Sequence, residues 1–277
     1  MPVPVTEQKV LRPLGHYQRH TDDFPCLLSP CTVIEVERYN KLYGDFAAVQ
    51  DLSFVVNPGD VLGLVGPNGA GKTTTLRALA GILQPTSGTI RICGLDLATR
   101  GVEAKSRLAF IPDEPQLFDY LTVSEHLQFI TRLYSVNDAD ARIAPLLDEL
   151  ELTAKKDSLP TELSRGMKQK LAIACGLLHE PAVLLLDEPL TGLDPVGIRR
   201  MKETISGRAR AGTAIVLSSH LLHLVEELCT RLLVIRKGRA VAFGTLDDIF
   251  ATHPELAGQP LEEVFLALTG DDAPAAT

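Results

Sequence analysis

One segment has the residue types and the spacing of a phosphate-binding loop. Residues 66–73 are Gly-Pro-Asn-Gly-Ala-Gly-Lys-Thr, which fits the pattern GxxxxGK[ST]. Glycines let the backbone turn so that several N–H groups point toward one anion, and the start of a helix adds positive potential there. A lysine in this pattern contacts the β- and γ-phosphates of a nucleotide, and the adjacent hydroxyl binds Mg²⁺. The pattern therefore predicts a nucleoside triphosphate site built from Gly66, Asn68, Gly69, Ala70, Gly71, Lys72, Thr73 and Thr74.

A pair of carboxylates supplies the second part of such a site. The apolar run Val183–Leu186 ends in Asp187 and Glu188, about 115 residues after the lysine. Asp187 would lie near a metal held by the phosphate loop, and Glu188 would accept a proton from attacking water or orient that water. Such a pair is weak evidence alone, but together with the phosphate loop it indicates hydrolysis of a nucleoside triphosphate. No NKxD-type segment for recognising guanine occurs in the chain.

Strands and helices must alternate to position these loops. The phosphate loop follows Val61–Val65, a short apolar run typical of a buried strand, and it opens a helical segment over residues 72–82. Comparable apolar runs occur at residues 108–111, 214–217 and 232–235, with helical segments between most of them. Alternating strands and helices predict an α/β fold with a mainly parallel sheet covered on both faces.

Two stretches differ from that alternation. Residues 33–39 alternate apolar and polar side chains, as a half-buried strand does, and we expect an antiparallel edge sheet near residues 33–56. Residues 117–162 have helical patterns and no strand pattern, and they include a capping box formed by Thr122 and Glu125. They predict a helical subdomain inserted into the α/β domain.

The two ends of the chain differ from its centre. Residues 1–31 carry five prolines and little periodicity, so we expect a loose extension, with a docking segment as the alternative. Residues 245–277 form the expected helical tail, whose last residues, 271–277, we expect to fray. Neither a signal peptide nor a run of about 20 apolar residues is found, which predicts a cytosolic chain that does not span a membrane.

Composition limits the partners and the compartment. The chain has 27 basic and 35 acidic residues, a net charge of −8 and a pI of about 5.4. Nucleic-acid binding needs a basic face to neutralise phosphates, so we expect no nucleic-acid partner. The five cysteines lack zinc-ligand spacing and predict free, mostly buried thiols in a reducing compartment. Histidines such as His126, His179 and His253 are expected at the surface or in helices.

Further motifs resemble those of ATP-binding-cassette (ABC) ATPases. Residues 163–170, Leu-Ser-Arg-Gly-Met-Lys-Gln-Lys, are similar to the LSGGQ signature of this family, and residues 189–195, Pro-Leu-Thr-Gly-Leu-Asp-Pro, to its D-loop. His220 stands where the family has its switch histidine, and Tyr43 where it has the aromatic residue that stacks on adenine. The resemblance covers roughly residues 32–244, with the motifs in the family's order.

This resemblance implies a P-loop NTPase core that binds ATP with Mg²⁺ and hydrolyses ATP. Two such domains, here expected to be identical, form a head-to-tail dimer with two ATPs between them. The implied catalytic residues are Glu188, His220 and Lys72. The implied nucleotide contacts beyond the phosphate loop are Tyr43, Ser164, Gly166 and Asp194, and the implied metal ligands are Thr73, Asp113 and Asp187.

The chain also looks like the cassette subunits of bacterial-type exporters whose membrane part is a separate polypeptide. Residues 261–269 resemble the short tail helix of such subunits. A multi-span membrane subunit is therefore the implied partner, and we expect the chain as a peripheral protein at the cytoplasmic face of the membrane. Two alternatives stay open: a non-transport ABC ATPase acting on nucleic acid or ribosomes, and a regulatory module that binds ATP but hydrolyses it poorly.

The sequence departs from the family pattern at three positions. The signature has Arg165 in place of glycine and Met167 in place of glutamine. It retains Ser164 and Gly166, which we expect to contact phosphate. Asp113 stands where the family usually has a glutamine that reaches the metal and the attacking water. A carboxylate is a good ligand for a hard metal but adds negative charge beside the γ-phosphate, and we expect Asp113 to serve as the metal or water contact.

Overall fold

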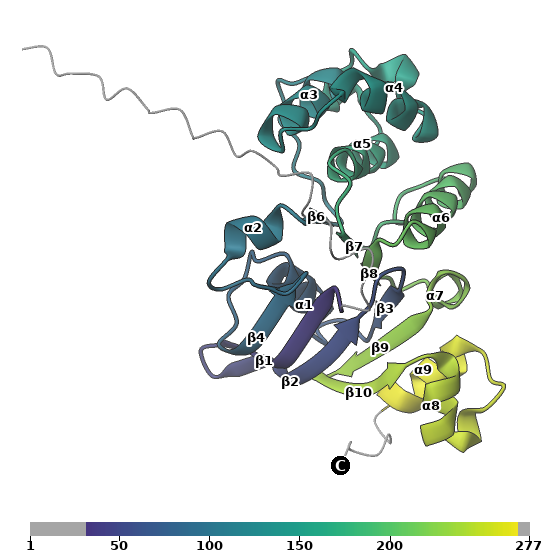
Figure 1. Cartoon of the computed structure of the whole chain (residues 1–277). Helices are drawn as coiled ribbons and strands as arrows, with labels where there is room; N and C mark the ends of the chain where they lie inside the picture. The colour runs from purple at the N-terminus through teal and green to yellow at the C-terminus, as the bar shows by residue number, and fades with distance from the viewer. Residues whose placement is uncertain (1–31, 271–277) are drawn as a thin grey trace, which may run out of the picture.

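A six-stranded sheet forms the centre of the molecule. The computed structural model describes residues 32–270 (Figure 1). The strands follow the order β10-β9-β3-β8-β7-β6. Their bounds are β3 Val61–Val65, β6 Leu108–Ile111, β7 Val183–Asp187, β8 Ala214–Ser218, β9 Arg231–Arg236 and β10 Arg239–Gly244. All neighbouring strands are parallel except β9 and β10, which confirms the predicted mainly parallel sheet.

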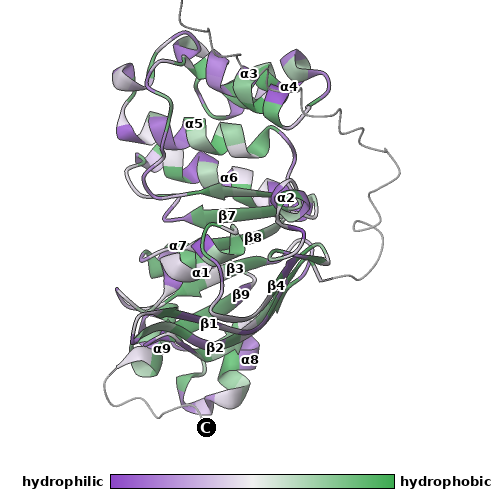
Figure 2. Ribbon diagram, turned by 90° about the vertical axis from the view of Figure 1, so that its left-hand side faces the viewer, coloured by the Kyte–Doolittle hydropathy of each residue, from purple (hydrophilic) through white to green (hydrophobic). Residues whose placement is uncertain are grey.

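Both faces of this sheet are covered, because its strands are apolar on both sides, as Figure 2 shows. Side chains alternate between two cores: Leu184 and Ile215 belong to one, and Leu185 and Val216 to the other. The first core also contains residues of α5 (Arg165–Leu177), α6 (Pro195–Arg210), α7 (Leu222–Leu228), α8 (Leu246–Thr252) and α9 (Leu261–Thr269). The second also contains residues of α1 (Lys72–Leu79), α2 (Gly101–Lys105) and a separate sheet.

That separate sheet is antiparallel and four-stranded, in the order β2-β1-β4-β5. Its strands are β1 Ile34–Tyr43, β2 Phe46–Val56, β4 Ser87–Ile92 and β5 Leu95–Asp96. The β1–β2 pair confirms the antiparallel strands predicted near residues 33–56, and it closes in a hairpin where Tyr43 faces Phe46. Residues 87–96 were not expected as strands, because only Ile90 and Ile92 of β4 are buried and the pattern is therefore weak.

Helices without strands fill the segment between β6 and α5. They are α3 Val123–Leu133, α4 Ala139–Glu149 and two single turns, η2 Thr153–Lys155 and η3 Pro160–Glu162. The predicted capping box is present: the Glu125 N–H donates to Thr122 Oγ1 (3.2 Å), and the Thr122 N–H donates to Glu125 Oε2 (2.7 Å). In both views this helical region lies at the end of the molecule opposite α8 and α9 (Figures 1 and 2). Within residues 32–270, no helix combines the length and the apolar character needed to cross a membrane.

One histidine differs from its prediction. His126 lies in α3, as expected, and His253 is a partly exposed residue directly after α8. His179 lies outside any helix and is buried. Its ring stacks on Tyr134 with centroids 3.9 Å apart, and its Nε2 lies 3.2 Å from the carbonyl oxygen of Leu108. An imidazole with both an aromatic and a polar partner is accommodated in the interior.

The predictions for the two ends of the chain have different outcomes. The tail helix expected at residues 261–269 is present as α9. The loose extension at 1–31 and the frayed end at 271–277 lie outside the described residues. The division of the chain at residues 32 and 244 stays a prediction.

Candidate active site

The phosphate loop joins β3 to α1, as its sequence pattern predicts. Two of its glycines are required by close packing. A Cβ atom at Gly66 would lie 2.3 Å from the carbonyl oxygen of Ile235, and one at Gly71 would lie 2.7 Å from that of Ala48. Gly71 also has φ +109°, a conformation that residues with a side chain rarely adopt. The loop is thus held between β2 and β9 in a shape that leaves its backbone free to surround an anion.

Lys72 is the first residue of α1, and its side chain folds over the phosphate loop. Its Nζ donates to the carbonyl oxygens of Gly66 (2.6 Å) and Pro67 (3.2 Å). Burial lowers the pKa of the Lys72 ammonium, and the nearby carboxylates of Glu188 and Asp187 oppose that shift. The Lys72 ammonium therefore lies over the loop, at the place where phosphates would bind.

Asp187 lies at the carboxyl end of β7, where it pairs with Ser218 at the end of β8. The Ser218 hydroxyl donates to Asp187 Oδ1 at 2.6 Å, and the Thr73 hydroxyl lies 3.5 Å from the same oxygen. Thr73 and Asp187 are both hard oxygen donors. Among residues 32–270, no group of three or more His, Cys, Asp or Glu is placed to hold a metal ion. Two protein oxygens fit Mg²⁺, which retains water molecules and binds substrate phosphates rather than filling an all-protein cage.

Glu188 follows in a strained backbone conformation, with φ +51°. Its N–H donates to the Ser218 side-chain oxygen at 3.2 Å. Its Oε2 lies 2.8 Å from His220 Nδ1 and accepts a hydrogen bond from the His220 N–H at 3.3 Å. Because β7 and β8 are neighbours, Ser218 and His220 at the end of β8 hold both carboxylates at the end of β7. Ser218 was missed in the sequence, although it lies only two residues before the expected histidine.

A second group of predicted residues gathers around the start of α5. Ser164 is the N-cap of this helix, and its Oγ accepts a hydrogen bond from the Met167 N–H at 3.3 Å. A Cβ atom at Gly166 would lie 3.0 Å from the carbonyl oxygen of Gly192, so the first turn of α5 packs on the loop after β7. At the end of that loop, Asp194 caps α6 by accepting a hydrogen bond from the Gly197 N–H at 2.9 Å.

Asp113 belongs to this second group. Its Oδ1 accepts a hydrogen bond from Arg165 Nη2 at 3.1 Å, and both side chains are substantially exposed. The two residues are 52 positions apart in the chain. Each departs from the family pattern, and their opposite charges were the only signal in the sequence that could have linked them.

Tyr43 lies at the end of β1 and is about half exposed, at 48%. The Lys41 ammonium lies 5.2 Å from the centroid of its ring. Its strand pairs with β2, which contacts the phosphate loop at Ala48 and Gly71. An accessible aromatic ring close to a phosphate loop is suited to stack on a nucleotide base.

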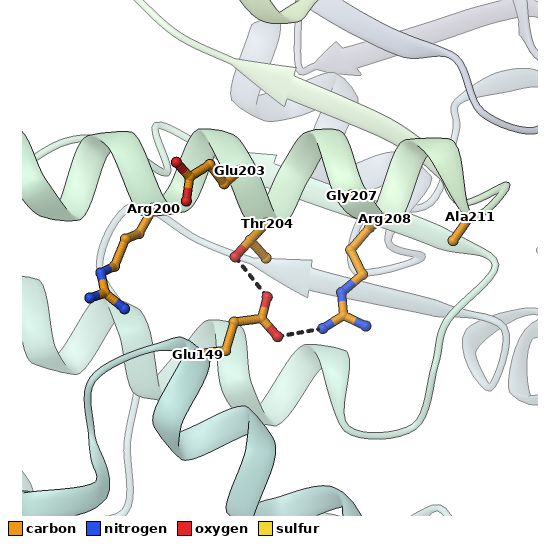
Figure 3. A pocket seen from close by; sticks show the side chains of 7 residues that line it. All are labelled: Glu149, Arg200, Glu203, Thr204, Gly207, Arg208 and Ala211. Atoms are coloured by element: carbon orange, nitrogen blue, oxygen red, sulfur yellow. Dashed lines mark hydrogen bonds and ion pairs between the residues drawn. The ribbon is translucent and has the colours of Figure 1, made fainter.

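One pocket of the described structure lies apart from these residues, between α4 and α6 (Figure 3). It is lined by Glu149, Arg200, Glu203, Thr204, Gly207, Arg208 and Ala211. Glu149 accepts hydrogen bonds from the Thr204 hydroxyl (2.8 Å) and from Arg208 Nη2 (2.9 Å). None of the predicted site residues lines this pocket. Its polar contacts attach α4 to α6.

Comparison with known proteins identifies the family. The ABC transporter family matches residues 49–191, more than half of the chain. The chain belongs to the ABC transporter family. It is an ATP-binding subunit of the kind that hydrolyses ATP to power transport, which confirms the fold and the activity expected from the motifs.

Individual relatives agree with this assignment. The chain is 41% identical over 226 residues to the Nod factor export ATP-binding protein I of Paraburkholderia xenovorans (strain LB400), a match that covers 81% of this chain and 74% of that protein. It is 34% identical over 244 residues to the probable multidrug ABC transporter ATP-binding protein YbhF of Escherichia coli (strain K12), covering 87% of this chain and 42% of the relative. A solved structure of an ATP-binding subunit of an ABC transporter superimposes with a TM-score of 0.82 at 37% identity, covering 86% of this chain and 99% of that one.

Proposed function

We propose that this ABC subunit powers an exporter and that Lys72, Thr73, Asp187, Glu188 and His220 carry out its hydrolysis of ATP. The observation that supports this most strongly is the arrangement at the end of β7. Asp187 lies beside the Thr73 hydroxyl, and Glu188 lies beside His220. The two relatives above are named for Nod factor export and for multidrug transport, which supports the direction of transport.

In the proposed reaction, the triphosphate of ATP binds to the backbone N–H groups of residues 68–74. Lys72 Nζ releases the carbonyl oxygens of Gly66 and Pro67 and donates to the β- and γ-phosphates instead. Thr73 and Asp187 would hold Mg²⁺, which neutralises charge on the phosphate oxygens. Tyr43 stacks on the adenine ring.

Glu188 is the proposed general base. A water molecule attacks the γ-phosphorus and gives a proton to the Glu188 carboxylate, while the bond from that phosphorus to the bridging oxygen of ADP breaks. The bonding electron pair leaves with ADP. His220 contacts Glu188 Oε2 through both its ring and its backbone N–H, so it orients the carboxylate toward the water.

Two identical chains are proposed to form the complete site. Ser164, Gly166 and Asp194 do not belong to the group around Glu188, but they gather at the exposed start of α5 and at the start of α6. In a head-to-tail dimer, the N-terminus of α5 would direct its positive potential at the γ-phosphate bound by the partner. The second copy would therefore complete the binding of ATP.

A membrane-spanning subunit is proposed to dock on the helical region. Four large apolar side chains on α3 and the preceding loop are exposed: Phe118 (55%), Tyr120 (92%), Phe129 (42%) and Leu133 (61%). The rings of Phe118 and Phe129 pack edge to face at 5.3 Å, and His126 Nε2 accepts a hydrogen bond from the Phe118 N–H at 3.0 Å. An ordered, exposed apolar surface of this kind marks a binding site for a protein partner. Docking there places the chain at the cytoplasmic face of the membrane, and the net charge of −8 argues against nucleic acid as the partner.

The first experiment measures phosphate release. We expect Glu188→Gln to lose nearly all steady-state ATP hydrolysis while still binding ATP, because the amide keeps the shape of the side chain but accepts no proton. Glu262→Gln, on the exposed side of α9, is the matched control and should hydrolyse ATP at the wild-type rate. Wild-type turnover in Glu188→Gln would remove Glu188 from the proposed role.

The second experiment concerns the partner. The tagged chain should co-purify with a multi-span protein from detergent-solubilised membranes. The double variant Tyr120→Ser/Phe129→Ser should lose that protein, whereas Leu266→Ser, an equally apolar exposed position on α9, should retain it. Equal recovery with both variants would place the docking surface elsewhere.

A further inference from the structure

The ion pair between Asp113 and Arg165 has no part in the hydrolytic steps proposed above. Asp113 lies in the loop that follows β6, and Arg165 is the first residue of α5. Their side chains meet at 3.1 Å between Oδ1 and Nη2. An exposed pair of this kind contributes little to the stability of a fold. Its position between two segments of the nucleotide site points instead to a role in arranging that site.

Arg165 also contacts a third segment. A Cβ atom at Gly192 would lie 3.1 Å from Arg165 Cδ and 3.4 Å from its Nε, so the side chain of Arg165 packs directly on the backbone of Gly192. Gly192 has φ +77° and belongs to the loop after Glu188. The start of that loop is tied to Glu188, because the Thr191 N–H donates to the Glu188 carbonyl oxygen at 3.1 Å. One arginine therefore contacts both the Asp113 loop and the loop that starts at the proposed general base.

The charges in this arrangement are complementary. A carboxylate at position 113 adds negative charge near a site that binds a triphosphate, and a guanidinium hydrogen-bonded to it compensates that charge. Arginine is suited to the task because it stays protonated and its planar head forms directed hydrogen bonds. Its long aliphatic stem can cover the Gly192 backbone at the same time.

We propose that Arg165 is a positioning residue for ATP hydrolysis. It holds Asp113 through its guanidinium and the Gly192 loop through its stem, so that the loop after β6, the first turn of α5 and the loop after Glu188 keep a fixed arrangement. Asp113 then acts through Arg165 rather than as an independent metal ligand. The inference rests on the proposed function, since it assumes that these loops serve ATP hydrolysis.

A double-mutant cycle tests the proposal. Asp113→Ala, Arg165→Ala and the combined variant are compared with the wild type by steady-state ATP hydrolysis, with both ATP and Mg²⁺ varied. We expect each single substitution to lower kcat by about two- to fivefold, the range of an exposed ion pair, with unchanged KM for ATP. The combined variant should be no slower than the slower single variant, because both substitutions break the same contact. Thermal unfolding of each variant establishes that it is folded.

Exchanging the charges at positions 113 and 165 tests whether the ion pair itself, rather than packing of the two side chains, supports hydrolysis. Asp113→Arg and Arg165→Asp each place like charges together and should lower kcat further, whereas the two combined should recover at least part of the loss. Independent, multiplicative losses in the alanine cycle, or failure of the exchanged pair to recover activity, would overturn the proposal. An increased Mg²⁺ requirement in Asp113→Ala but not in Arg165→Ala would also overturn it and assign Asp113 to the metal.

Glu188→Gln is measured in parallel, so that failure of the proposed function can be told apart from failure of the proposed role of Arg165. Wild-type turnover in that variant contradicts the proposed function itself. Loss of turnover in Glu188→Gln together with independent effects at positions 113 and 165 contradicts only the role of Arg165.

Discussion

Glu188 has an unfavourable backbone conformation that its neighbours stabilise. A residue with a side chain in the left-handed region costs of order 1 kcal/mol, and such residues are frequent at active sites. Here the Glu188 N–H donates to both the carbonyl oxygen and the hydroxyl of Ser218 at 3.2 Å, and His220 holds the carboxylate. In this conformation the Glu188 carboxylate lies beside the His220 ring. The rigid arrangement of donors suits a group that must face one particular water molecule.

The charge of Lys72 should contribute strongly to the affinity for ATP. Lys72→Ala should weaken binding of ATP with Mg²⁺ by roughly ten- to hundredfold, because a hydrogen bond to a charged group contributes about 1.5–3 kcal/mol. Isothermal titration calorimetry measures the affinity. Lys156→Ala, which removes an exposed lysine outside the site, is the control and should bind ATP as the wild type does. Equal affinity of the two variants would contradict the assigned phosphate loop.

At the scale of elements, the packing of α7 on β3 depends on one glycine. A Cβ atom at Gly63 would lie 2.7 Å from Val225 Cγ1 and 2.9 Å from Cys229 Sγ. Gly63→Ala should lower the free energy of unfolding by about 1–3 kcal/mol, the usual cost of overpacking a core. Gly207→Ala in α6 is the control, because a Cβ atom there meets nothing within 4 Å, and it should raise stability by about 0.5–1 kcal/mol. Equilibrium unfolding in urea measures both, and equal stabilities would contradict the packing of α7.

The same core predicts unreactive thiols. Cys175 and Cys229 are free thiols, as expected, while Cys26 and Cys31 lie outside the described residues. Both side chains are partly buried against the first core, and this burial raises the pKa of Cys175 and of Cys229 to about 12, so few of these thiols are reactive thiolates at pH 8. Iodoacetamide at pH 8 should therefore leave both cysteines unmodified in the native protein and modify both in guanidinium chloride. Mass spectrometry locates the adducts, and fast native labelling at either position would contradict the burial.

Local patterns explain which elements the sequence could predict. The phosphate loop, the capping box and the buried strands depend on neighbouring residues, so their spacing was sufficient. The strands β4 and β5 were missed, because their half-exposed residues lack a clear alternation. Ser218, and the contact of Asp113 with Arg165, were missed for another reason. They depend on which segments far apart in the chain become neighbours, which only the strand order and the packing of α5 decide.

In the molecule as a whole, two regions of the described residues have different proposed roles, one in ATP hydrolysis and one in docking the membrane subunit. Lys72 at the start of α1 and Asp187 and Glu188 at the end of β7 belong to the first region. The second is the helical region at one end of the molecule (Figure 1), whose large apolar side chains are exposed. The start of α5 lies between the two, since Arg165 contacts the loop after β6 and α5 continues into the helical region. Movement of α5 on ATP binding would therefore reach the proposed membrane-facing surface directly.

ATP is proposed to join two copies of this chain, and hydrolysis at Glu188 is proposed to end their association. Size-exclusion chromatography with light scattering of Glu188→Gln measures this association, because the variant should bind ATP without cleaving it. With ATP and Mg²⁺ the mass should rise from the 30.0 kDa of one chain to about 60 kDa. It should stay at one chain without nucleotide, and also with ATP when Lys72→Ala is added. A mass of one chain under saturating ATP and Mg²⁺, or a dimer that forms equally well without nucleotide, would contradict dimerisation driven by ATP.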